Sequence, residues 1–156
     1  MTAILAGIAI AERRKGPMVQ CDRADVTVDA GILGDARGTF RKRQITVLFL
    51  PSWVEACAEV SADLPWTMRR ANFLVDGMTA PQRPGSRLRV GDVVLEVTQE
   101  THPCEVMERA HPGLREALRP DWRGGVCCSV LVGGHVAVGD PVTLLGQYVG
   151  GVETAL

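Results

Sequence analysis

The chain has 156 residues, of which 46% are hydrophobic and 22% charged, the size and balance of one globular domain with a sizeable core. Seventeen Lys and Arg against 18 Asp and Glu leave a net charge of -1, so no global positive field attracts nucleic acid or an anionic membrane. Aromatic residues, at 4%, are too few to build stacking platforms for single-stranded nucleic acid. We expect a single domain over residues 1–156 that binds neither nucleic acid nor a membrane.

The cysteines indicate a reducing compartment. There are five of them, and Cys127 and Cys128 are adjacent, which does not match the evenly spaced framework of a secreted disulfide protein. The apolar N-terminal residues come before the basic ones, the reverse of the order in a signal peptide. No apolar run reaches the roughly 18 residues that a membrane span needs. We therefore expect a cytoplasmic protein.

Short apolar stretches separated by Gly, Pro and Asp recur along the chain, too briefly and too often for a helical bundle. Residues 24–29 alternate with period two, and residues 44–50 form a continuous run typical of a strand buried on both faces. Glycine–aspartate pairs at 91–92 and 139–140 are expected to form strand corners. The expected strands are residues 4–10, 24–29, 44–50, 88–90, 93–98, 126–132, 136–138 and 142–145. These seven or eight strands can close a small barrel, which predicts a mainly β fold.

Helices are expected to be few and short, as lids or connectors of the strands. Ser52 and Glu55 have the spacing of a capping box, which predicts a helix over residues 52–60. Two more helices are expected over residues 104–110 and 112–118, the second with a proline in its first turn.

The segment Thr101-His-Pro-Cys-Glu105 places a thiol where a strand gives way to a short helix. In the first turn of that helix, free backbone N–H groups and the helix dipole would favour the thiolate of Cys104. If the segment is extended, His102 and Cys104 lie on one face, and an imidazolium would act in the same sense. Glu105 and Glu108 bring negative charge close by, and free cysteine is often simply buried. The spacing leaves a reactive and a packed Cys104 both open.

Basic and polar side chains gather in two loops, each beside an apolar strand. Gly34, Asp35 and Arg37 lead into the basic run that ends at Arg43, and the second loop spans residues 69–72. Loop arginines on a rigid barrel can form a phosphate or carboxylate pocket, and the alternative is a solvated charged loop.

Several familiar sites are missing from the sequence. It contains no Cys-x-x-Cys pair for zinc, no Gly-x-Gly-x-x-Gly, no P-loop and no Gly-x-Ser-x-Gly elbow. The adjacent Cys127 and Cys128 would alternate faces in a strand, so one is expected to point into the barrel and the other out. We expect both to pack rather than react.

Five segments, in chain order, together resemble the MOSC domain, which occurs at the C-terminus of molybdenum cofactor sulfurases and as small stand-alone bacterial proteins. The resemblance covers nearly the whole chain. The segments are Gly31-Ile-Leu-Gly-Asp35 with Arg43-Gln-Ile-Thr46, residues 70–75, residues 85–98, Pro103-Cys104, and residues 125–142 ending in Gly-Asp-Pro-Val.

The resemblance implies a single closed or partly open β-barrel with two or three short helices, similar to the barrel domain of pyruvate kinase. It also implies that Cys104 is the key cysteine, either as a persulfide carrier or as a ligand to molybdenum held by a pterin dithiolene. Arg43, Arg70, Asn72 and the Gly34-Asp35 turn would then hold the pterin phosphate or shape the pocket, with Arg37 beside them. On this interpretation Cys104 and His102 are the candidate catalytic residues.

Two classes of function follow. In the first, Cys104 either accepts sulfur from a cysteine desulfurase and passes it on, or ligates molybdenum in a molybdopterin-type cofactor that reduces N-hydroxylated compounds. The protein would then be a sulfur transferase or a molybdenum-dependent oxidoreductase. In the second, it is a non-catalytic module that binds or delivers the cofactor, and Cys104 is structural.

The resemblance also bears on cofactors and partners. The pyridoxal phosphate chemistry of full-length sulfurases belongs to a separate domain, and with Lys15 and Lys42 as the only lysines we expect no Schiff base here. The expected partners are a cysteine desulfurase or molybdenum-cofactor proteins. Exposed strand edges could also pair two copies into a homodimer.

Overall fold

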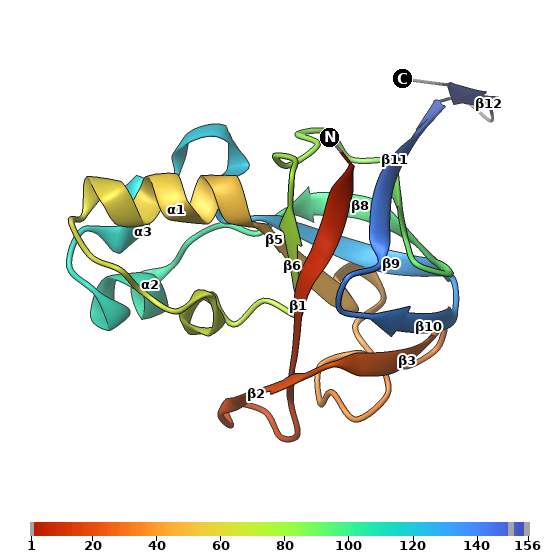
Figure 1. The fold of residues 1–156 in the computed structure, drawn as a ribbon, viewed down its shortest axis with the longest axis horizontal. Helices are drawn as coiled ribbons and strands as arrows, with labels where there is room; N and C mark the ends of the chain where they lie inside the picture. Colours follow the sequence, from red (N-terminus) through yellow and green to blue (C-terminus); the bar gives the residue numbers. More distant parts are fainter. Residues whose placement is uncertain (1, 150–151, 155–156) are drawn as a thin grey trace.

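A computed structural model describes residues 2–149 and 152–154, and its centre is a closed barrel of seven strands (Figure 1). In chain order the barrel strands are β1 (Ala3–Ala11), β5 (Ile45–Phe49), β6 (Phe73–Asp76), β7 (Ser86–Val90), β8 (Val93–Glu100), β9 (Val126–Val132) and β11 (Pro141–Val149). The predicted mainly β barrel is confirmed.

The order around the barrel is β1-β11-β7-β8-β9-β5-β6 and back to β1. Closure comes from antiparallel pairing of the first and last of these strands, with Ala3 opposite Val142 and Ile4 opposite Pro141. Every barrel pair is antiparallel except β5 and β6, which run parallel with Val47 opposite Phe73. Parallel neighbours need a crossover connection, and here it runs through the first helix.

The barrel interior is filled by apolar side chains from alternate positions of its strands. Leu5, Phe49, Phe73, Leu88 and Leu95 are among those that are fully buried. β5 is buried along its whole length because helices cover its outer face, which is why its sequence is continuously apolar.

Further short strands extend this framework. β2 (Met18–Cys21) pairs with β1, and β12 (Val152–Thr154) pairs with β11. A separate three-stranded sheet joins β10 (Gly134–Ala137), β3 (Arg23–Thr27) and β4 (Gly31–Ile32).

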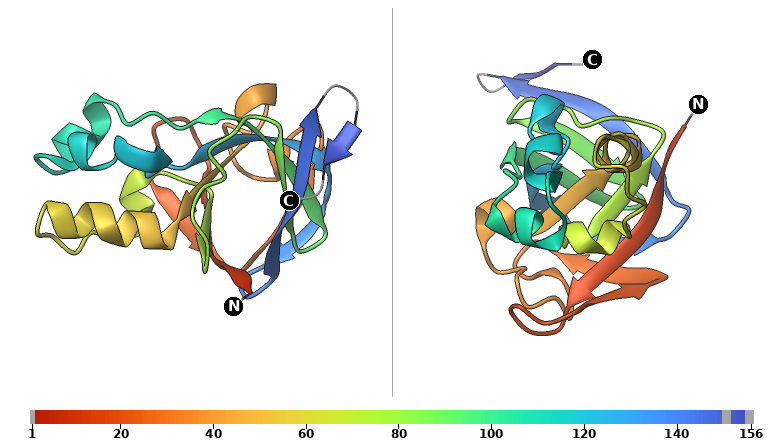
Figure 2. Two further views of the ribbon diagram at one scale, coloured as in Figure 1. Left: turned by 90° about the horizontal axis from the view of Figure 1, so that it is seen from above. Right: turned by 90° about the vertical axis from the view of Figure 1, so that its left-hand side faces the viewer.

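The three α-helices lie together on one side of the barrel, as the second view in Figure 2 shows. The three α-helices are α1 (Leu50–Glu59), α2 (Glu105–Ala110) and α3 (Leu114–Ala117), and the three 3-10 turns are η1 (Arg41–Arg43), η2 (Trp66–Arg69) and η3 (Pro120–Trp122). The α-helices and η2 bury a second apolar cluster against the outside of β5 and β6, which includes Leu48, Leu74, Met107 and Leu114, whereas η1 lies against β8 and β9. Within the described ranges, no helix is long and apolar enough to cross a membrane.

Some local expectations were wrong. The predicted capping box does not form: β5 runs straight into α1, so the N-cap is Phe49 and no side chain caps the helix. Ser52 instead lies buried inside the first turn, next to Pro51. Pro112 precedes α3 instead of starting it, because the left-handed Gly113 is the N-cap.

The strand predictions were wrong in two respects. β6 is a barrel strand that periodicity alone did not indicate, because its four residues, Phe73–Asp76, are too few to show a pattern. Residues 24–29 and 136–138, expected as barrel strands, fall mainly in β3 and β10 of the smaller sheet. The corners at Gly91 and Gly139 formed as expected, with φ of 56° and 101°.

Candidate functional site

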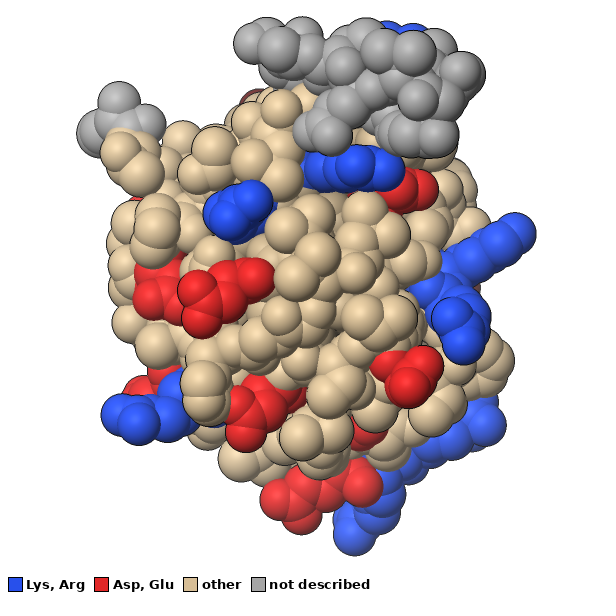
Figure 3. Space-filling model, turned by 90° about the vertical axis from the view of Figure 1, so that its right-hand side faces the viewer, with Lys and Arg blue, Asp and Glu red and all other residues tan. Residues whose placement is uncertain are grey.

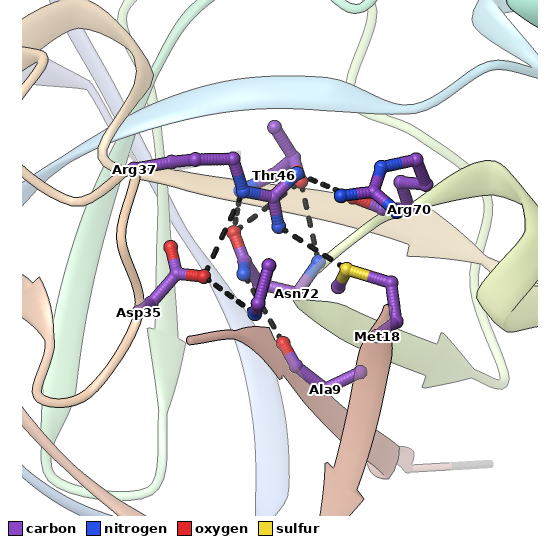
Figure 4. Close-up of polar contacts among 8 residues, drawn as sticks. Ala9, Met18, Asp35, Arg37, Thr46, Arg70 and Asn72 are labelled. Carbon is purple, nitrogen blue, oxygen red and sulfur yellow. Dashed lines mark hydrogen bonds and ion pairs between the residues drawn. The ribbon is translucent and has the colours of Figure 1, made fainter. Parts of the chain in front are cut away.

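The site begins where the parallel pair β5–β6 opens, and Asn72 holds this point together (Figure 4). Its Oδ1 accepts a hydrogen bond from the backbone N–H of Thr46 at 3.0 Å, and its Nδ2 donates to the carbonyl of Ala9 at 3.1 Å. Asn72 is only 2% exposed. A buried amide with both ends satisfied fixes the positions of β1, β5 and β6 around the pocket.

The loop after β4 carries the Gly34-Asp35 turn. Gly34 adopts a φ of 92°, and the buried Asp35 carboxylate accepts a hydrogen bond at Oδ1 from the backbone N–H of Ala11 at 3.0 Å. The same oxygen lies 3.6 Å from Nε of Arg37, whereas Asp35 Oδ2 has no hydrogen-bond partner. Asp35 therefore anchors Arg37 from beneath the pocket.

Arg37 ties this loop to the loop before β6. Its Nη1 donates to the carbonyl of Arg70 at 3.1 Å, and its Nη2 lies 3.6 Å from Sδ of Met18 (Figure 4). Burial lowers the pKa of Arg37 from its usual value, and the negative charge of Asp35 opposes this shift. The guanidinium is thus held in place, at the cost of partial desolvation.

These loops enclose a basic pocket of about 440 Å³. Its lining residues come from the β1–β2 hairpin, the loop after β4, η1, β5 and the loop before β6: Arg14, Lys15, Arg37, Phe40, Arg43, Thr46, Arg70 and Asn72. Arg70 reaches the pocket from a left-handed backbone conformation, φ 64°. In the part of the chain that the structure describes, the side chains of Arg14, Lys15, Arg43 and Arg70 form no ion pair with a carboxylate.

Cys104 lies directly beside this pocket. It is the N-cap of α2, its carbonyl accepts a hydrogen bond from the N–H of Met107 at 2.9 Å, and its side chain belongs to an exposed residue. A second cavity of about 140 Å³ is lined by Cys104 and shares four residues with the first: Arg37, Arg43, Thr46 and Arg70. The thiol and the basic loops, predicted separately from the sequence, therefore meet in one place.

Arg69 is a further residue of the smaller cavity, which sequence reasoning located only as part of a basic loop. It is 8% exposed, and its Nε and Nη2 donate to the carbonyls of Gly124 and Thr101 at 3.1 and 2.8 Å. Burial lowers the pKa of Arg69 to about 10, with nearby Cys104 acting in the opposite direction. The sequence contained one sign of this close packing, the Gly124-Gly125 pair. A Cβ at Gly124 would lie 2.5 Å from the Thr101 carbonyl oxygen, so a side chain there would clash.

His102 is not brought to the cavities. It lines neither of them, its side chain is 79% exposed, and its Nδ1 lies 3.5 Å from Oε1 of Glu100. The helix starts one residue later than expected, so Cys104 is not in its first turn but is the N-cap of α2, with an extended backbone.

The remaining cysteines divide between the two faces of the barrel wall. Cys128 is fully buried in the interior cluster, and burial raises its pKa above the ordinary thiol value. Cys127 points outward, with Sγ 3.3 Å from Oγ1 of Thr101. The predicted alternation is confirmed. All five cysteines are free, and the described residues contain no cluster of three or more His, Cys, Asp or Glu that could hold a metal ion.

One face of the molecule carries mixed charge. On the face shown in Figure 3, acidic and basic side chains are interspersed among uncharged ones, so that face carries no field of a single sign.

One comparison with known proteins identifies a family. A family model described as the MOSC domain matches residues 36–143, a range that includes Arg37, Arg43, Arg70, Asn72 and Cys104. No curated protein matches the chain.

Several solved structures share the fold. The YUAD protein from Bacillus subtilis is similar with a TM-score of 0.74 and 24% identity, over 91% of this chain and 94% of that one. YiiM from Geobacillus stearothermophilus is similar with a TM-score of 0.73 and 17% identity, over 97% and 79%. YiiM from Escherichia coli gives 0.68 and 18%, over 93% and 71%.

Proposed function

Because this chain belongs to the MOSC domain family, which is associated with the molybdenum cofactor, we propose that it binds a molybdopterin-type cofactor with Cys104 as the protein ligand to molybdenum. One observation carries the proposal. Two adjacent cavities share four lining residues. The smaller cavity is lined by the thiol residue Cys104, and the larger one by cations without carboxylate partners. An elongated ligand with a soft metal at one end and a phosphate at the other matches that arrangement.

The donor set fits both ends of such a ligand. Thiolate is a soft donor suited to molybdenum–sulfur bonding, and arginine forks match the oxygens of a phosphate. Arg43 and Arg70 would contact the phosphate directly, because their side chains have no other partners within the described residues. Arg37, which Asp35 and the Arg70 carbonyl hold in place, would supply the third guanidinium. When bound, the cofactor supplies two-electron redox chemistry, for which N-hydroxylated compounds are the substrates we propose.

Other parts of the chain organise this pocket. Asn72 fixes the strands that form its floor, and Arg69 ties the Thr101 loop to Gly124, which keeps Cys104 next to the arginines. The exposed thiol of Cys104 remains accessible to a ligand or partner. His102 would act only if it turned from Glu100 toward the cavity, so we assign it no role in binding.

A second function uses the same thiol as a persulfide carrier. Its support is the exposure of Cys104, because thiol–disulfide and persulfide exchange need access for an incoming sulfur donor. A cysteine desulfurase or another molybdenum-cofactor protein would be the partner, in the reducing cytosol that five free cysteines favour. The same exposure argues against a purely structural Cys104 in a delivery module.

The test is molybdenum content after expression in a host that makes the cofactor, with anaerobic purification. We expect near-stoichiometric molybdenum in the wild type, loss of most of it in Cys104→Ala, and retention in Cys21→Ala, a matched control at a partly buried cysteine. The Arg43→Gln and Arg70→Gln variants should retain less pterin. Equal molybdenum in the wild type and Cys104→Ala would rule out ligation by Cys104.

A further inference from the structure

The small cavity at Cys104 is walled by four guanidinium groups. Arg37, Arg43, Arg69 and Arg70 all line this space of about 140 Å³. Such a space accommodates an anion of a few heavy atoms, whereas a pterin needs the wider pocket as well. The cavity therefore has a local preference of its own, set by its size and charge.

This cavity has little negative charge to balance its arginines. Of the four arginines, only Arg37 forms an ion pair with Asp35, and no ion pair with a carboxylate forms at Arg43, Arg69 or Arg70 in the described part of the chain. Arg69, although buried, donates only to two backbone carbonyls. A buried guanidinium without a carboxylate stabilises an incoming anion strongly, because water screens it poorly.

The acidic residues next to Cys104 in the sequence are turned to other partners. Glu105 forms an ion pair with Arg115 at 3.2 Å, and Glu108 Oε2 accepts a hydrogen bond from the N–H of Gly113 at 3.0 Å. Glu100 lies against His102. None of these carboxylates lines the cavity, although the charge of Glu100 still acts on Arg69 and offsets part of the positive field.

We propose that this cavity binds thiosulfate and that Cys104 takes its outer sulfur, which gives the protein a thiosulfate sulfurtransferase activity. The Cys104 thiolate attacks the outer sulfur, a new S–S bond forms on the cysteine, the S–S bond of thiosulfate breaks, and sulfite leaves with the electron pair. Cysteine persulfide and sulfite are the products. A nucleophilic acceptor such as cyanide then removes the sulfur as thiocyanate and restores the thiolate, so no external oxidant or reductant is needed.

The four arginines reduce the charge repulsion that opposes this step. Thiosulfate is a dianion and the nucleophile is an anion, so like-charge repulsion opposes their encounter in water. The guanidinium groups neutralise the sulfonate oxygens in bidentate fashion and stabilise sulfite as it departs. Arg43 and Arg70 are free to bind these oxygens, while Arg69 contributes charge from a fixed position.

This activity uses the same thiol as the proposed function but needs no bound cofactor. It rests on the proposed function only in that both require Cys104 to be accessible. Its failure and that of molybdenum binding are therefore distinguishable, because one is measured in protein from a host that lacks the cofactor and the other as metal content.

The experiment measures thiocyanate formation from thiosulfate and cyanide by the cofactor-free full chain, with mass spectrometry of the protein after thiosulfate alone. We expect saturable turnover, a mass increase of one sulfur atom located on Cys104, and loss of both in Cys104→Ser. Arg43→Gln and Arg70→Gln should each lower kcat/KM for thiosulfate about tenfold, the effect of removing one charge-assisted hydrogen bond. Sulfate, of similar shape and charge but without transferable sulfur, should compete.

Two controls separate this activity from unspecific thiol chemistry. Cys21→Ser removes another incompletely buried cysteine, and Arg89→Gln removes an exposed arginine on β7, so both should keep wild-type rates. The proposal is overturned if the wild type forms no more thiocyanate or persulfide than Cys104→Ser. Rates in Arg43→Gln and Arg70→Gln equal to that of Arg89→Gln would overturn the role of the arginine cavity.

Discussion

The inside of the barrel and the helical layer outside it are both apolar, yet they are enclosed differently. Hydrogen-bonded strands surround the interior on every side, and Leu95 is fully buried there. The outer cluster has β5 and β6 on one side and three short helices on the other, with Leu114 equally buried. The interior is thus a rigid enclosure, while the outer cluster has a wall that can move.

The difference explains the position of the site. Among the described residues, the barrel interior is filled mainly by buried apolar side chains. Where the outer helical layer ends, the outward-facing positions become polar, as at Thr46 and Asn72, and loops carrying arginines replace the helices. The rigid wall fixes the floor of the pocket, and the loops supply its chemistry.

The largest expected effect is a matched pair of leucine truncations. Leu95→Ala should lower the free energy of unfolding by about 4–5 kcal/mol, because a closed ring of strands cannot collapse onto the cavity. Leu114→Ala should cost about 3 kcal/mol, since α3 can shift to fill part of the space. Urea unfolding of both variants measures the difference. A larger loss for Leu114→Ala would reverse the comparison of the two clusters.

Asn72 lies at the boundary between the clusters, and its replacement comes next in size. Asn72→Ala leaves the Thr46 N–H and the Ala9 carbonyl buried without their partner, which should cost about 2–4 kcal/mol. Urea unfolding at constant m-value gives this loss. A loss under about 0.5 kcal/mol would show that water replaces the amide and that Asn72 does not hold the strands.

The smallest expected effect compares the two adjacent cysteines. Cys128→Ser places a hydroxyl in the apolar interior and should cost about 2 kcal/mol, whereas Cys127→Ser keeps the Thr101 hydroxyl as a partner and should cost under about 1 kcal/mol. Thermal unfolding of the pair tests this. Equal losses would mean that the two faces of β9 do not differ in polarity as the structure indicates.

Much of the barrel was predictable because its strands are long enough to show a pattern. Residues 126–132 were predicted as a strand and form β9 with the same bounds, and β5 showed its double burial in the sequence. The turn chemistry of Gly91 and Gly139 also follows from local rules. The closure between β1 and β11 is a pairing of distant residues, which no local rule specifies.

The sequence indicated which residues form the site but not how they are arranged in space. Cys104 and the arginine loops stood out individually, but their meeting depends on the parallel β5–β6 crossover, which brings residues 69–72 next to the start of α2. The burial of Arg69 left only an indirect signal, the Gly124-Gly125 pair, because its hydrogen-bond partners are backbone carbonyls. The position of His102 depended on the backbone conformation around Pro103, for which the sequence was compatible with both a helix start and an extended segment.

The pairing of β1 with β11 also determines when this protein can fold. Ala3 must pair with Val142, so the ring cannot close during translation until residue 142 has left the ribosome. Until then one edge of β1 exposes unpaired backbone groups that can join a strand of another nascent chain. Contacts so distant in sequence also make folding slow. Its yield in cells should therefore depend on translation rate and chaperone supply more than its final stability suggests.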